Sequence, residues 1–242
     1  MRTSNVMAPE AQRMTVADRI VANYAPSALW VAEPADLIGG TAIIGWRDHS
    51  GNGVNCPTIT GTAPTSTAAD SNFANRPVVA FSGGYLSTTA TFADGDLCLL
   101  VVFRDPSVTG TYEVLVDLAY ANNATIYRTS ATADSWLCGI IEPISPWGQS
   151  VTAADGGRPH ALFLRRSGTT HDVWVDGKQA ATKVGSGSTC TAATLKIGGG
   201  ASGGNYGGSI ALVAKWASSP TDATLQAITR ILRAGYMIGE EP

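Results

Sequence analysis

The apolar positions of this chain recur mostly with the two-residue period of β-strands. Short alternating or fully apolar runs lie between clusters of Gly, Ser, Asn and Pro, which is typical of an all-β protein. The strand candidates are residues 28–32, 43–48, 76–81, 97–103, 113–118, 125–127, 136–141, 160–165, 173–175, 194–197 and 209–216. We therefore expect short strands that follow one another through tight turns and loops.

The best-defined turn follows the strand candidate at 173–175. Asp176 and Gly177 come directly after it. Asp-Gly after an alternating run favours a tight hairpin, because that turn needs backbone angles that Gly, Asn and Asp adopt at low cost. We expect the chain to return through 179–181 and to reach the strand at 194–197 through a Gly/Ser loop.

Residues 97–103 are apolar at every position, whereas a strand with one face in water would alternate. Successive side chains of a strand point to opposite faces. One face carries Leu97, Leu99, Val101 and Phe103, and the other carries Cys98, Leu100 and Val102. We expect one set to fill the space between two sheets. The other set should lie under the C-terminal helix or a neighbouring subunit, because a monomer seldom leaves a large apolar patch in water.

Two helices are predicted, one near each end of the chain. The first predicted helix covers residues 15–23. Thr15 is a plausible N-cap, Asp18 stands three residues later, and Pro26 ends the segment. Residues 220–235 carry apolar side chains at helical spacing.

The ends of the second helix are assigned from local sequence signals. Ser219 is the expected N-cap, Pro220 suits the first helical position, and Gly235 is placed to end the helix. Residues 57–72, rich in Thr, Ala, Ser and Pro, are interpreted as a surface loop.

Composition supports a globular chain and excludes some partners. Apolar residues make up 44% of the 242 residues and charged residues 14%, which argues against disorder. The net charge is -3, and Arg165-Arg166 is the one adjacent basic pair. Sequence-independent binding to nucleic acid needs a clustered basic face, so we expect no nucleic-acid partner.

The sequence predicts neither export nor membrane insertion. Residues 1–19 carry charged and polar side chains where a signal peptide would be apolar. No apolar stretch approaches the roughly 20 residues needed to cross a bilayer. The four cysteines, at 56, 98, 138 and 190, are far apart and suggest neither a metal cluster nor a redox motif. Cys98 is expected to be a buried, reduced side chain.

An ordered set of motifs runs through most of the chain. The set comprises residues 28–30, 46–53, 75–81, 102–104, the strand around His160, 173–177, 195–198 and the last strand with its helix. This set resembles the concanavalin A-like lectin/glucanase superfamily, in its laminin-G-like branch. The resemblance implies a jelly-roll sandwich of two curved antiparallel sheets. Domains of this kind bind sugars, bind proteins, serve as accessory modules of enzymes or form parts of bacteriophage virions. We expect residues 1–27 to form an arm and short helix, and 28–242 one such domain.

The carboxylates do not match a glycosidase of that superfamily. Hydrolysis needs two carboxylates about the scissile bond, roughly 5 Å or more apart. Glucanases of the superfamily place theirs along one strand in a Glu-x-Asp-x-x-Glu or similar spacing. Glu113 and Asp117 lie four apart on one strand and should share a face, but no third carboxylate or Trp surrounds them in that pattern, so we interpret both as solvated strand positions. A Ser-His-Asp site is not indicated either, since no Gly-x-Ser-x-Gly elbow occurs. His160 is expected to make ordinary hydrogen bonds and His171 to be exposed. No catalytic residue is assigned.

Candidate ligand contacts are aromatic residues in loops. Sugar binding commonly uses exposed aromatics beside amide or carboxylate groups, and the candidates are Trp136, Trp147 and Tyr206 with Asn205. The alternative is that such aromatics close an edge of the sandwich or fill a subunit interface. The tryptophans at 30, 46, 174 and 216 fall on predicted strands and are expected in the core.

Asp48 is the one weak candidate for a metal ligand. It precedes the loop Ser50-Gly51-Asn52-Gly53, whose oxygens would suit calcium. The alternative needs no ion: the Asp48 carboxylate accepts hydrogen bonds from the loop backbone and braces the glycine turn.

These observations favour a non-enzymatic, lectin-like structural or adhesive component of a larger assembly. A bacteriophage virion is the expected location, because phage proteins made in the host cytoplasm leave by lysis. The expected partners are other virion proteins, with a cell-surface glycan as a further ligand, and the chain is expected to be an oligomer or assembly subunit. The alternatives are a free carbohydrate-binding protein and a hydrolase of the same superfamily. Fold alone does not distinguish them.

Overall fold

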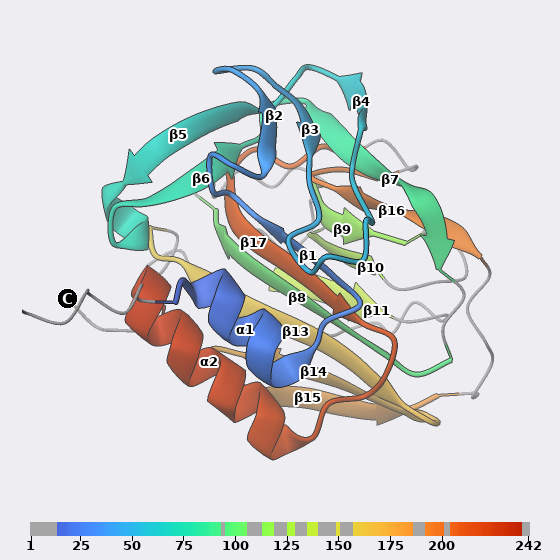
Figure 1. Cartoon of the computed structure of the whole chain (residues 1–242). Helices are drawn as coiled ribbons and strands as arrows, with labels where there is room; N and C mark the ends of the chain where they lie inside the picture. The colour runs from blue at the N-terminus through green and yellow to red at the C-terminus, as the bar shows by residue number, and fades with distance from the viewer. Residues whose placement is uncertain are drawn as a thin grey trace, which may run out of the picture.

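The computed structural model describes residues 14–92, 95–105, 113–118, 125–128, 135–139, 149–150, 157–185, 192–200 and 204–238. Within these ranges two large antiparallel sheets, a small two-stranded sheet and two helices are formed (Figure 1). The predicted all-β sandwich with a short N-terminal helix and a C-terminal helix is confirmed.

The first large sheet has the strand order β15-β14-β13-β8-β17-β6-β5, and β1 also pairs with β17. Its strands are β1 Ala28–Val31, β5 Thr65–Asp70, β6 Arg76–Ala80, β8 Leu97–Arg104, β13 His160–Ser167, β14 Thr170–Val175, β15 Lys178–Val184 and β17 Ser209–Trp216. Strands distant in sequence are therefore neighbours, and β8 lies between β13 and β17.

The second large sheet has the order β12-β11-β10-β9-β16-β7-β4. Its strands are β4 Thr58–Gly61, β7 Gly84–Phe92, β9 Glu113–Asp117, β10 Thr125–Arg128, β11 Ser135–Gly139, β12 Gln149–Ser150 and β16 Ala193–Ile197. The two-stranded sheet joins β2 Leu37–Gly39 to β3 Ile43–Trp46, and a single 3-10 turn covers Ser71–Phe73.

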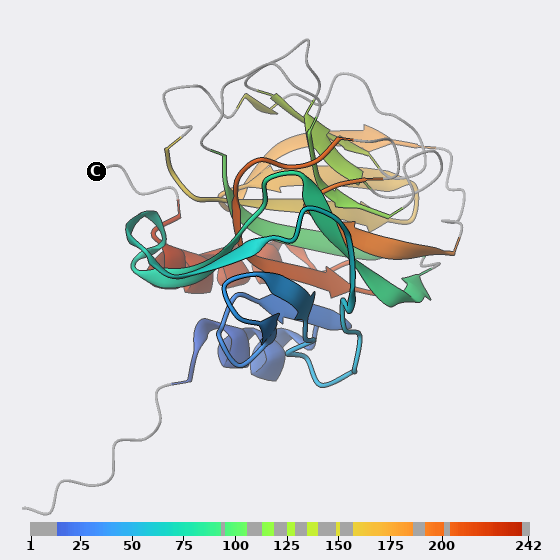
Figure 2. The same ribbon diagram turned by 90° about the horizontal axis from the view of Figure 1, so that it is seen from above.

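Strand β8 is buried on both faces, as its sequence predicts. The set that includes Leu99 and Phe103 lies in the core between the two sheets. The set that includes Leu100 lies in a second core with Leu225 and Ile228 of the C-terminal helix. Figures 1 and 2 show both helices on the outer side of the eight-stranded sheet, with β9, β10 and β11 on the opposite side of the molecule. The C-terminal helix therefore covers the second face of β8.

The predicted hairpin joins β14 to β15 at Asp176 and Gly177. Both residues have positive φ, 49° and 82°, which is the backbone of the expected tight turn. The carboxylate of Asp176 accepts from the backbone N of Ala161 at 2.8 Å and contacts Nδ1 of His160 at 2.8 Å. The turn packs against the C-terminal helix, since a Cβ on Gly177 would lie 2.9 Å from Thr229.

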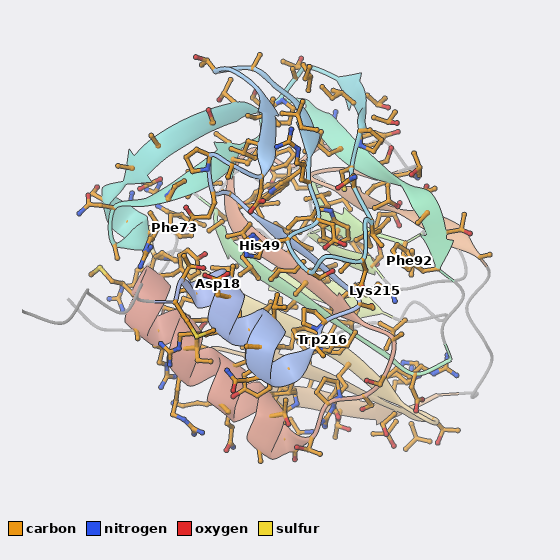
Figure 3. The ribbon with its side chains drawn as sticks, viewed as in Figure 1. Asp18, His49, Phe73, Phe92, Lys215 and Trp216 are labelled. Carbon is orange, nitrogen blue, oxygen red and sulfur yellow. The ribbon has the colours of Figure 1, made fainter. Side chains whose placement is uncertain are left out.

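Helix α1, Val16–Tyr24, begins at the predicted N-cap. The Thr15 hydroxyl accepts from the backbone N of Asp18, and the Asp18 carboxylate accepts from the Thr15 backbone, which completes a capping box. The other oxygen of Asp18 lies 3.2 Å from Nε2 of His49, whose Nδ1 lies 2.7 Å from Asp36 (Figure 3). His49 thus links α1 to the turns beside β2 and β3.

Helix α2, Asp222–Tyr236, begins and ends later than the sequence predicts. Thr221 is the N-cap instead of Ser219, because its extended backbone lets its hydroxyl accept from the backbone N of Thr224 at 3.2 Å. The carbonyl of Pro220 lies outside the helix and accepts from Arg165 at 2.7 Å.

Gly235 was expected to end α2 and instead lies inside it. A Cβ at this position would be 2.3 Å from Cγ2 of Val16, so the two helices approach each other closely at Gly235. Met237, with φ 56°, ends the helix in the left-handed conformation. The contact with Val16 therefore explains the glycine at position 235, which local sequence signals assign to the end of the helix.

Two further expectations need correction, and Lys215 adds a feature that was not expected. Residues 57–72 form β4 and β5 and not a loop: most of their side chains are exposed, and pairing with β7 and β6 holds them. His171 is buried and not exposed, with Gly185 packed over its ring. Lys215, on an otherwise apolar strand, is fully buried with Nζ 4.4 Å from the centroid of the Phe92 ring (Figure 3).

The close approach at Gly235 predicts that Gly235→Ala destabilises the protein. In an open helix this change would stabilise by up to about 1 kcal/mol. Here the added methyl group collides with Val16, and overpacking costs about 1–3 kcal/mol. Urea unfolding should show the loss, and the double variant Gly235→Ala/Val16→Ala should recover part of it. An unfolding free energy equal to or above that of the parent would contradict this packing.

The His49 bridge predicts a pH-dependent contribution to stability. Burial alone would lower the pKa of His49, but the hydrogen bonds to Asp36 and Asp18 outweigh it and raise the pKa. The protonated ring donates to both carboxylates. This contribution is complete below the unfolded pKa of about 6.5 and is lost as the pH rises through the higher folded pKa.

His49→Gln should therefore reduce stability at about pH 5.5 more than at about pH 8.5. Urea unfolding of both proteins at the two pH values measures the difference. An equal loss at both pH values would exclude the protonated bridge.

Candidate functional site

The outer face of the seven-stranded sheet carries a row of polar side chains. The row is a chain of cross-strand partners: Thr58 of β4 opposite Ser87 of β7, Ser87 opposite Lys196 of β16, Lys196 opposite Asp117 of β9, and Asp117 opposite Thr125 of β10. Directly opposed residues point to the same face of a sheet. Five strands therefore place these five side chains side by side.

The strand patterns determine that this row faces away from the core. Leu195 and Ile197 flank Lys196 and lie between the sheets, so Lys196 points outward. In β9 a register irregularity against β10 puts both Leu115 and Val116 into the core. Asp117 then points outward with Lys196.

Burial increases along the row. Thr58 is exposed, Ser87 and Lys196 are half-buried, and Asp117 and Thr125 are buried. Gly200 packs against the buried end, since a Cβ there would lie 3.1 Å from Oδ2 of Asp117. The row thus runs from an exposed residue on β4 to buried residues on β9 and β10.

Lys196 lies between a carboxylate and an aromatic ring. Its Nζ is 3.7 Å from Oδ2 of Asp117 and 5.9 Å from the centroid of the Tyr85 ring. The hydroxyl of Thr125 donates to Oδ1 of Asp117 at 3.0 Å. The Lys196 side chain is 17% exposed and that of Asp117 only 1%, so Lys196 is mostly buried and Asp117 almost completely buried.

An aromatic ring lies beside the ammonium, and an amide lies on the other side of Gly199 from this ring. Tyr85 is half-buried, and Asn205 is exposed and donates from Nδ2 to the Gly83 carbonyl at 3.1 Å. Gly199 separates them: a Cβ there would lie 2.9 Å from both Oδ1 of Asn205 and Cδ1 of Tyr85. We call the surface formed by Tyr85, Ser87, Lys196 and Asn205 the Lys196 face.

The structure brings one of the sequence-predicted contacts, Asn205, into this face. Tyr206 was a candidate as an exposed aromatic, but it is fully buried, and its hydroxyl donates to the Arg104 carbonyl at 2.6 Å. Its ring packs against Phe81 and Phe103 because it closes one end of the core. Trp136 lies on β11 with its side chain outside the described residues, and Trp147 lies outside them altogether.

Tyr85 and Lys196 were not singled out from the sequence, although a signal was present. Leu86 and the pair Leu195 and Ile197 are core residues, so alternation alone puts Tyr85 and Lys196 on the polar face of their strands. The sequence does not show that β7, β16 and β9 are neighbours in one sheet.

The interpretation of Glu113 and Asp117 as solvated positions is wrong, since both are buried. Asp117 is tied to Thr125 and Lys196, and Oε1 of Glu113 lies against Gly207, where an added Cβ would be 3.2 Å away. Their burial separates both carboxylates from the open end of the row.

Asp48 adopts the bracing role. Its Oδ1 accepts from the backbone N atoms of Leu29 and Ser50, both at 2.9 Å, and its Oδ2 accepts from the Ser50 hydroxyl at 2.9 Å and the backbone N of Val54 at 3.0 Å. Four hydrogen bonds from protein donors satisfy the Asp48 carboxylate, so its position is explained without a bound ion. No group of three His, Cys, Asp or Glu side chains suited to a metal occurs in the described part of the chain.

Other side chains with potential chemistry are buried or engaged. The tryptophans at 30, 46, 174 and 216 are in the cores, as predicted. Cys56, Cys98 and Cys138 are free and buried, and burial raises the pKa of each thiol, which makes it a poor nucleophile. Neither helix of the described residues has the length and apolar character to cross a bilayer.

Comparison with solved structures identifies several proteins that share this fold. Domain 4 of a GH43 extracellular arabinanase from Geobacillus stearothermophilus, solved with arabinotriose, aligns with a TM-score of 0.62 and 13% identity over 84% of this chain and 98% of that domain. A chain of botulinum neurotoxin type C, from a study of its ganglioside-dependent cell entry, aligns with a TM-score of 0.56 and 9% identity over 79% of this chain. A sialidase from Trypanosoma rangeli aligns with a TM-score of 0.53 and 11% identity over 85%.

These similarities define the fold class. The chain spans about half of the neurotoxin chain, 51%, and about a third of the sialidase, 32%. No protein-family model matches the sequence, and no curated protein matches it. Structure therefore places the chain in the β-sandwich fold class, without a family.

The pair Lys196–Asp117 predicts a measurable coupling energy. Asp117→Ala should destabilise by about 2–4 kcal/mol, because it leaves a mostly buried ammonium without its carboxylate. Lys196→Met in the same protein should reduce that loss, with a coupling of about 1 kcal/mol in the double-mutant cycle. Urea unfolding of the four proteins gives the value, and additive losses would show that the pair does not interact.

Proposed function

We propose that this chain is a non-enzymatic, lectin-like glycan-binding module whose ligand lies on the Lys196 face, which we therefore call the glycan face. The observation that carries the proposal is the convergence of the Tyr85 ring, the Lys196 ammonium and the Asn205 amide from separate segments of the chain. Small-molecule sites combine apolar surface with a few polar groups in this way.

The chemistry of these side chains suits a sugar. A pyranose has an apolar face that packs on an aromatic ring and a rim of hydroxyl groups that donate and accept hydrogen bonds. Tyr85 supplies the ring, Lys196 supplies donors, and Oδ1 of Asn205 is an acceptor. The hydroxyl groups of Ser87 and Thr58 extend the polar row toward open surface.

Proteins with this fold bind saccharides. The arabinanase domain was solved with arabinotriose, and cell entry of the type C neurotoxin depends on two ganglioside molecules. At identities of 13% and 9% the fold alone is shared, so these ligands supply the general class of partner and no particular sugar.

Burial of the carboxylates supports a binding role in preference to hydrolysis. A glycosidase needs an acid and a second carboxylate that both reach the substrate. Glu113 and Asp117 lie on β9 and are buried, and Asp117 is engaged by Thr125. Glu113→Gln should leave saccharide binding unchanged, and polysaccharide hydrolysis that disappears in this variant would argue for the alternative.

We extend the proposal to the laminin-G-like branch and to a virion. The support is the set of sequence motifs, and the proposed partners are other proteins of the particle in an oligomeric assembly. Mass spectrometry of purified particles tests this: presence at a fixed copy number supports it. A protein found entirely outside particles would instead favour a free carbohydrate-binding protein.

Tyr85→Ala should weaken saccharide binding about tenfold or more, because it removes the apolar platform. A glycan array followed by isothermal titration of the strongest saccharide measures the change. Tyr24→Ala is the matched control, since this half-buried tyrosine lies at the end of α1 on the helix-covered side.

The two variants give distinct outcomes. Loss of affinity in Tyr85→Ala with retention in Tyr24→Ala supports the glycan face. Unchanged affinity in Tyr85→Ala would move the site elsewhere, and an array without any binding would overturn the proposed function.

A further inference from the structure

The Lys196 ammonium has unused hydrogen-bonding capacity. It carries three donors, its carboxylate neighbour lies at 3.7 Å, and none of the described residues places an acceptor within hydrogen-bond distance. Its side chain is mostly buried, so few water molecules reach it. A donor in such a place gains from an acceptor that a ligand brings.

The carboxylate of the pair is shielded from a ligand. Asp117 is 1% exposed, Thr125 occupies one of its oxygens, and Gly200 packs against the other. Glu113 is also buried and lies four residues away along β9, about 13 Å at the rise of a strand. Among the described residues of the row, the charge that a ligand meets is therefore positive.

The aromatic ring determines where the ligand's acceptor must be. Nζ lies over the Tyr85 ring, 5.9 Å from its centroid, so a sugar that packs against the ring lies next to the ammonium. An acceptor atom on a substituent, one or two bonds outside the sugar ring, therefore reaches Nζ. Hydroxyl groups and anionic substituents occupy such positions, but an anionic oxygen accepts the stronger, charge-assisted hydrogen bond.

We infer that the glycan face selects acidic sugars and that Lys196 sets this specificity. The inference rests on the proposed function and adds the ligand class: a pyranose with an anionic substituent, either a carboxylate or a sulfate ester. Asp117 and Tyr85 act as positioning groups, because they hold the ammonium at the edge of the sugar site while its donors remain directed to the ligand.

Three saccharides of matched ring stereochemistry test the ligand class: neutral oligogalactose, oligogalacturonate and sulfated oligogalactose. With the intact chain, at least one acidic saccharide should bind about tenfold or more tightly than the neutral one. The two acidic probes distinguish a carboxylate from a sulfate. The preference should fall as ionic strength rises from about 20 mM to about 200 mM, because the contact lies near the surface.

Variants assign the preference to Lys196. Lys196→Met and Lys196→Gln should bind neutral and acidic saccharides alike, whereas Lys196→Arg should keep the preference. Lys178→Met is the matched control, because this exposed lysine lies on β15, in the other sheet.

The outcomes separate the inference from the proposed function. Equal affinity for neutral and acidic saccharides, with binding still dependent on Tyr85, would overturn the inference and leave the glycan face standing. Retention of the preference in both Lys196→Met and Lys196→Gln would also overturn it. A chain that binds none of the saccharides of the array or the three probes would overturn both.

Discussion

Burial of strand β8 on both faces is the constraint on which the remaining structure depends. Seven consecutive apolar residues must be removed from water on two sides. The seven-stranded sheet covers the face that includes Phe103, and helices α1 and α2 cover the face that includes Leu100. Gly235 then matters because it lets α1 pack closely against α2 over this face.

This arrangement explains why the polar row lies where it does. The eight-stranded sheet has apolar cores on both faces, so β8 and its neighbours have little space for solvated side chains. In the seven-stranded sheet, β16 alternates between core residues and outward polar residues such as Lys196. The same alternation that builds the core therefore collects Ser87, Lys196 and Asp117 on the opposite face.

Features governed by local chemistry were predictable from the sequence, and features governed by distant contacts were not. The Thr15 capping box, the Asp176-Gly177 turn and the two-sided burial of β8 follow from short patterns. Strands β4 and β5 lack an apolar pattern and were missed, since backbone pairing at a sheet edge holds them in place of buried side chains. Tyr206 between glycines suggests an exposed loop, and only its packing in the end of the core shows otherwise.

The central claim is that a glycan binds the outer face of the seven-stranded sheet. Hydrogen–deuterium exchange of the intact chain, with and without a saturating saccharide from the array, tests it most directly. The account predicts slower exchange at residues 84–87 and 195–200, which carry Tyr85, Ser87 and Lys196. Protection confined to α1 and α2, or to the strands of the eight-stranded sheet, would contradict it.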